Sequence, residues 1–114
     1  ATVLNKVNVN KNVIDTVKNG MLSVTEDGTG SRIFKDYSIT VGGKTGTAET
    51  TKGVDNAVFI AFAPYDDREI AVAVVVEHGK FGTYAGNLVK SIFSSYFFTQ
   101  MTNTTESPAY QLLQ

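Results

Sequence analysis

The sequence predicts an α+β fold in which an antiparallel sheet is sandwiched between helices. Two unbroken apolar runs, residues 57–63 and 70–76, are rich in branched and aromatic side chains, which is typical of strands covered on both faces. Turn-forming residues, 64–69, separate them, so the two runs should form an antiparallel hairpin. Apolar residues at helical spacing predict two helices: residues 11–26, which precede these strands in the sequence, and residues 84–98, which follow them.

The first helix follows an extended lead-in, residues 1–9, and begins after Asn10, whose side chain suits an N-cap. Gly20 should weaken this helix by about 1 kcal/mol relative to alanine. Its apolar residues recur on one face: Ile14, Val17, Met21 and Val24. The glycine-rich stretch 27–31 then ends the helix. We interpret this stretch as a turn rather than a phosphate-binding loop, because no strand precedes it and no helix N-terminus is predicted after it.

A half-exposed strand is predicted over residues 37–47, because apolar and small polar residues alternate there with a period of two. The two apolar runs that follow are expected to be central strands of the sheet. The helix over 84–98 should lie across that sheet through one apolar face: Ala85, Val89, Ile92, Phe93, Tyr96 and Phe97. Several phenylalanines are core candidates: Phe59, Phe62, Phe93, Phe97 and Phe98.

The polar residues 99–114 show no periodicity and predict a tail, so we expect residues 1–98 to form one structural unit. Two strands that are apolar on both faces need a helical layer on each side, and two helices leave one face largely bare. We therefore expect this unit to fold together with further chain.

Composition excludes several classes of function. The 114 residues carry a net charge of −1 with scattered basic residues, which argues against a nucleic-acid partner. With no cysteine and the single histidine His78, expected in a loop, we predict no metal site and no cofactor. Asp66 and Asp67 are interpreted as a solvated turn. No apolar run reaches the roughly 18 to 20 residues of a membrane helix, so any anchor should lie outside this chain.

The segment from Lys44 to Thr47 combines a lysine with two hydroxyls, Thr45 and Thr47, on a strand with little side-chain bulk. Gly42, Gly43 and Gly46 have no Cβ, so we expect a peptide-like ligand to approach the backbone and pair as an added strand. The ammonium supplies positive charge, and the hydroxyls can donate to a carboxylate. The pattern predicts a carboxylate-binding site, against the alternative of a surface lysine among threonines.

The stretch 43–49 resembles the third motif of the penicillin-binding protein transpeptidases and their relatives, the serine β-lactamases. Its Thr-Ala-Glu continuation is more similar to the transpeptidases than to the β-lactamases. The resemblance extends over roughly residues 4–98. Four further stretches share the order and spacing of the family: 17–21, 28–30, 56–64 and 70–77.

The resemblance implies an enzyme that acylates a serine with a D-Ala-D-Ala peptide stem and passes the acyl group on. Lys44 and Thr47 would then be catalytic: Lys44 through positive potential and a hydrogen bond to a serine of the family's Ser-x-Asn motif, and the Thr47 N–H as an oxyanion donor. Lys44, Thr45, Gly46 and Thr47 would together bind substrate. Glu49, directly after this segment, is interpreted as a solvated carboxylate, and Tyr84 is expected near the cleft.

The family's Ser-x-x-Lys and Ser-x-Asn motifs are not found at any serine of this sequence. In the family both motifs precede Lys-Thr-Gly, so we expect this chain to be the C-terminal part of a longer enzyme. The expected partners are the upstream portion of the same domain, a peptidoglycan stem peptide and β-lactam antibiotics. The expected location is the extracytoplasmic face of the bacterial cell membrane. The alternatives are a D,D-carboxypeptidase, a β-lactamase-like sensor, or a noncatalytic module that binds peptidoglycan or β-lactams.

Overall fold

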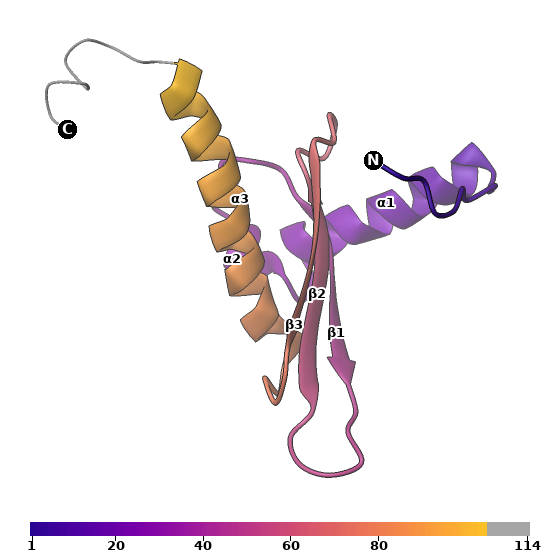
Figure 1. The fold of residues 1–114 in the computed structure, drawn as a ribbon, viewed down its shortest axis with the longest axis vertical. Coiled ribbons are helices and arrows are strands. Elements are labelled where there is room, and N and C mark those ends of the chain that lie inside the picture. The colour runs from indigo at the N-terminus through magenta and orange to yellow at the C-terminus, as the bar shows by residue number, and fades with distance from the viewer. Residues whose placement is uncertain (105–114) are drawn as a thin grey trace, which may run out of the picture.

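The computed structural model describes residues 1–104 and, within them, a three-stranded antiparallel sheet with helices on both sides. In Figure 1 the sheet is seen nearly edge-on, with α3 and α2 to its left and most of α1 to its right. This arrangement confirms the predicted fold class. In chain order the elements are α1 (Lys11–Glu26), α2 (Ser31–Phe34), β1 (Gly42–Ala48), β2 (Asn56–Ala63), β3 (Ile70–Val76) and α3 (Gly82–Thr104).

The strand order is β1-β2-β3, so β2 is central and β1 and β3 are the two edges of the described sheet. β2 pairs antiparallel with both neighbours, with Phe59 opposite Thr45 on β1 and opposite Val74 on β3. The β2–β3 hairpin is therefore confirmed, but the expectation that both of its strands are central is wrong for β3. The two strands have similar apolar runs in the sequence, so only their pairing in the structure shows that β2 is central and β3 is an edge strand.

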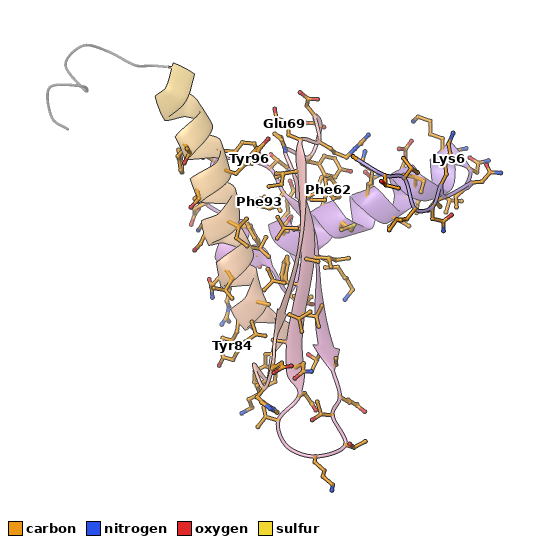
Figure 2. All side chains as sticks on the ribbon, in the orientation of Figure 1. Lys6, Phe62, Glu69, Tyr84, Phe93 and Tyr96 are labelled. Atoms are coloured by element: carbon orange, nitrogen blue, oxygen red, sulfur yellow. The ribbon has the colours of Figure 1, made fainter. Side chains whose placement is uncertain are left out.

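One face of the sheet is covered by α3 and α2. Phe59 on β2 and Val89 and Phe93 on α3 are fully buried between these layers, and Figure 2 shows Phe93 between α3 and the strands. On the other face Ile60 is 44% exposed and Val75 is 61% exposed. This second face is largely bare within the described residues, because α1 covers only a small part of it, and the expectation that two helices leave one face largely bare is confirmed.

Helix α1 begins as predicted, with the Asn10 side chain accepting a hydrogen bond from the Asn12 backbone N–H at 2.8 Å. Its expected apolar face is only partly used, since Ile14 and Val17 remain exposed. Figure 1 shows that the N-terminal part of α1 projects beyond the sheet. Its C-terminal end packs on β1. There the buried Thr25 hydroxyl donates to the Val41 carbonyl at 2.5 Å and ties the end of α1 to the start of β1.

Strand β1 begins at Gly42, five residues later than the predicted start at residue 37. The alternating side chains before it do pack inward: Val41 is buried, and Tyr37 and Ile39 lie against the core. The pairing of β1 with β2 begins at Gly42, which lies opposite Phe62. Before Gly42, the Thr40 carbonyl accepts a hydrogen bond from the Tyr65 N–H at 2.8 Å, outside the regular pairing of the two strands. The period-two pattern therefore predicted correctly which side chains of residues 37–41 face the core, but it did not predict where strand pairing begins.

The short helix α2 begins at Ser31, the last residue of the glycine-rich stretch. Ile33 and Phe34 from this single turn are buried in the core, which explains why the chain turns back toward the sheet at this point. The prediction that no helix follows the glycines is wrong. Four residues are too few for a helical period to be visible in the sequence.

Helix α3 extends from Gly82 to Thr104, beyond the predicted end at residue 98 and into the segment that was predicted as a tail. Ala85, Val89 and Phe93 are fully buried as expected, whereas Ile92 is 40% exposed and lines an open pocket together with Val74 of β3. Residues 105–114, the rest of the predicted tail, lie outside the described residues.

Candidate active site

An open groove of about 340 Å³ lies between the edge of the sheet and the start of α3. It brings together all four residues that the sequence predicted to bind substrate. Three chain segments contribute to it: the loop after α1, strand β1, and the first turn of α3 with the residue before it. The lining residues are Thr29, Lys44, Thr45, Gly46, Thr47, Phe81, Gly82 and Thr83.

Strand β1 forms one wall of this groove and pairs only with β2 within the described residues. The backbone on its outer side therefore remains available to an extended ligand, which could bind by adding a strand to the sheet. This is the edge at which the sequence predicted a peptide-like ligand to pair. The arrangement suits a peptide or a peptide mimic rather than a compact, deeply enclosed molecule.

Strand alternation places the Lys44 side chain on the face opposite to Thr45 and Thr47. Its ammonium is exposed and donates to the Thr45 carbonyl oxygen at 2.5 Å, so it returns to the strand edge. Thr45 lies on the face of Phe59, its register partner. A ligand carboxylate at this edge would therefore meet hydroxyls from one face and the ammonium from the other.

The glycines at the start of β1 serve internal packing. A Cβ added to Gly42 would lie 2.5 Å from the Phe62 ring, and one added to Gly43 would lie 2.7 Å from the Phe59 ring. Both glycines are buried. Aromatic rings of β2 fill the space that their missing side chains leave, so internal packing explains these two glycines. Pairing of a ligand with the outer edge of the strand stays a prediction.

The contact between α3 and β1 also depends on a glycine. A Cβ added to Gly82 would lie 2.6 Å from the Gly46 carbonyl oxygen and 2.8 Å from the Val58 carbonyl oxygen. Backbone atoms cannot rotate away as a flexible side chain can. The first residue of α3 therefore sits directly on the strand that carries the groove, and only glycine permits this distance.

We expect Gly82→Ala to push the start of α3 away from β1, destabilise the protein by about 1–3 kcal/mol and weaken ligand binding in the groove. Thermal unfolding and binding of a labelled ligand would measure the two effects. Gly20→Ala is the matched control, since nothing lies within 4 Å of its added Cβ, and it should stabilise α1 by up to about 1 kcal/mol. A Gly82→Ala protein as stable as the wild type would contradict this close packing.

Sequence reasoning missed Thr29, Phe81 and Thr83 as groove residues. The Thr29 hydroxyl oxygen lies 3.0 Å from the Thr45 hydroxyl oxygen. The signal available in the sequence was a hydroxyl residue held between two glycines. Tyr84 was expected near the cleft, but it is 56% exposed at the start of α3 (Figure 2), and the Phe81 ring, 6.3 Å from that of Tyr84, lines the groove instead.

The remaining candidates lie outside the groove. Glu49 follows β1 and is exposed. His78 is a loop residue as predicted, with a φ of +56° and its Nδ1 3.1 Å from the Val54 carbonyl oxygen. Asp66 and Asp67 lie in the exposed turn between β2 and β3. Among the described residues, no three metal-binding side chains gather.

Residues 1–97 match the family described as penicillin binding protein transpeptidase domain. The chain belongs to this family. The matched residues include every residue that lines the groove, so the groove lies within the part of the chain that is similar to the family.

Individual relatives agree with the family. The chain is 32% identical to the peptidoglycan D,D-transpeptidase MrdA of Acinetobacter baumannii, over 94% of this chain and 18% of that protein. Among solved structures, penicillin-binding protein 2 of Pseudomonas aeruginosa, in complex with WCK 5153, superposes with a TM-score of 0.73 at 33% identity, over 81% of this chain and 21% of that one. Penicillin-binding protein 2B of Streptococcus pneumoniae superposes with a TM-score of 0.73 at 27% identity, over 93% and 18%.

The chain thus spans about a fifth of the length of the relatives that it matches. None of the helices in the described part of the chain combines the length and apolar character needed to cross a membrane.

Proposed function

We propose that this chain forms the substrate-binding edge of a serine D,D-transpeptidase that cross-links peptidoglycan stem peptides. The observation that carries the proposal is the groove along β1, where one lysine and four threonines gather at a strand edge that has no partner among the described residues, in a member of the transpeptidase family. A D-Ala-D-Ala stem is an extended peptide that ends in a carboxylate. The groove offers a backbone edge for the peptide and a cationic, hydroxyl-rich end for the carboxylate.

The proposed chemistry proceeds through an ester. A serine Oγ attacks the carbonyl carbon of the penultimate D-alanine, and its proton passes to a base. The base returns a proton to the nitrogen of the terminal D-alanine, the C–N bond breaks, and that residue leaves as the acyl-enzyme forms. An amine of a second stem peptide then attacks the ester and releases the serine. The family's two serine motifs are not found in this sequence, so we place the nucleophile in a segment that lies outside it and faces the groove.

Within this scheme, Lys44 supplies positive potential for the terminal carboxylate and a hydrogen bond to a serine of the facing segment. Thr45 and Thr47 hold the carboxylate through their hydroxyls, and Gly46 leaves the strand edge open between them. The Thr47 backbone N–H stabilises the oxyanion that develops on the attacked carbonyl. Gly82, at the start of α3, packs against the backbone of this strand at Gly46.

A β-lactam would occupy the same groove, because its carboxylate and its lactam carbonyl mimic those of the peptide. We place the site on the extracytoplasmic face of the bacterial membrane, where peptidoglycan is assembled, with any membrane anchor in a segment outside this chain. The similarity to the peptidoglycan D,D-transpeptidase MrdA of Acinetobacter baumannii supports this assignment.

The proposal is tested by treating two proteins with a labelled penicillin and analysing them by mass spectrometry. The protein that carries this chain together with its upstream portion should gain one covalent adduct, and the isolated chain should gain none. Preincubation with unlabelled ampicillin, as the control, should prevent labelling. A stable adduct on a serine of the isolated chain would refute a nucleophile outside it. No adduct on either protein would favour the noncatalytic binding module.

A further inference from the structure

Thr29 lies in the loop after α1 and lines the groove opposite residues of strand β1. Its hydroxyl oxygen lies 3.0 Å from that of Thr45, sixteen residues further along, and either hydroxyl can be the donor. Both residues line the groove, and Thr29 is exposed. The hydroxyl that the family motif supplies on β1 therefore has a second hydroxyl as its neighbour.

The two hydroxyls together carry two protons and use one of them between themselves. The remaining proton points away from the pair and is available to an acceptor in the groove. When Thr29 donates to Thr45, the free proton is that of Thr45, and the donated bond polarises the Thr45 hydroxyl and strengthens its own donation. A carboxylate bound beside Thr45 only accepts hydrogen bonds, so it favours the arrangement in which the free proton is that of Thr45.

The loop that carries Thr29 is held by its backbone on both sides. Gly28 N–H donates to the Ser23 carbonyl at 2.9 Å, and Gly30 N–H donates to the Val24 carbonyl at 2.9 Å. A Cβ on Gly28 would lie 2.9 Å from the Val24 Cα atom, so the loop is packed against the end of α1. That end is joined to the start of β1 through the Thr25 hydroxyl.

We propose that Thr29 is a positioning residue for carboxylate recognition, which orients and polarises the Thr45 hydroxyl so that its proton faces the ligand. This inference rests on the proposed function of the groove. It extends the site from one strand to the loop after α1. The substrate feature that Thr29 serves is the terminal carboxylate of the peptide, or the ring carboxylate of a β-lactam, rather than the carbonyl that is attacked.

The test compares acylation of the complete enzyme by a penicillin and by its methyl ester, which lacks the anionic carboxylate. Thr29→Val keeps the shape of the side chain and removes the hydroxyl. It should lower the acylation rate constant for the acid about fivefold, the scale of one hydrogen bond, and leave that for the ester unchanged. Thr29→Ser should retain the wild-type rate. Thr51→Val, at an exposed position outside the groove lining, is the control.

A double-mutant cycle separates positioning from an independent contact. In a Thr45→Val background, Thr29→Val should cause no further loss for the acid. Additive losses, or equal losses for acid and ester, would overturn the positioning role. If Thr45→Val lowers acylation and Thr29→Val does not, this inference fails while the proposed function stands. If neither Lys44→Ala nor Thr45→Val alters acylation, the proposed function fails as well.

Discussion

Lys44→Ala, in the enzyme that contains this chain and its upstream portion, is expected to lower the rate of β-lactam acylation by about 10²- to 10³-fold. Lys44 lines the groove and is exposed, and its ammonium donates a hydrogen bond to the carbonyl of the next residue. Its removal takes charge from the ligand site without opening a cavity. The melting temperature should therefore change little.

Stopped-flow or gel-based acylation by a fluorescent penicillin, measured beside thermal unfolding, would check this result. Lys52→Ala is a suitable control, because Lys52 is an exposed lysine in the loop after β1 and does not line the groove. If Lys44→Ala leaves the acylation rate unchanged and lowers the melting temperature, Lys44 is structural and its assignment to the site is wrong.

Phe93→Ala is expected to cost about 3 to 5 kcal/mol of stability. Phe93 is fully buried between α3 and the sheet, with its ring 6.3 Å from that of Phe97. The cavity would loosen α3, whose first residue, Gly82, sits on β1. Acylation should therefore weaken together with stability, in contrast to Lys44→Ala. Chemical denaturation and penicillin acylation of the same variant measure both quantities.

The control for this variant is Asn87→Ala on the exposed side of α3. Lys90, which also lies on α3, is not suited to that purpose. Its ammonium donates to the Ile33 carbonyl at 2.9 Å and lies 5.5 Å from the centre of the Tyr37 ring. Similar, small effects of Phe93→Ala and Asn87→Ala on unfolding would show that α3 does not hold the sheet.

The sequence by itself determined the hairpin of β2 and β3, the helix α1 with its Asn10 cap, and the motif around Lys44. Each of these depends on neighbours in the chain. An apolar run, a turn and an N-cap are recognised within a few residues, because hydrophobic periodicity and capping act over one or two turns or strand repeats. The family resemblance likewise rests on the order of short stretches along the chain.

Only the tertiary structure decided which contacts form between distant segments. It placed β3 at an edge, assigned Gly42 and Gly43 to packing against rings of β2, and brought Thr29 to Thr45. It also showed that β1 begins at Gly42, where pairing with β2 starts, and not at residue 37, where the alternating side chains begin. A residue's own side chain and spacing indicate that it will be buried or exposed, whereas its partner depends on how the strands and helices pack, which local periodicity does not encode.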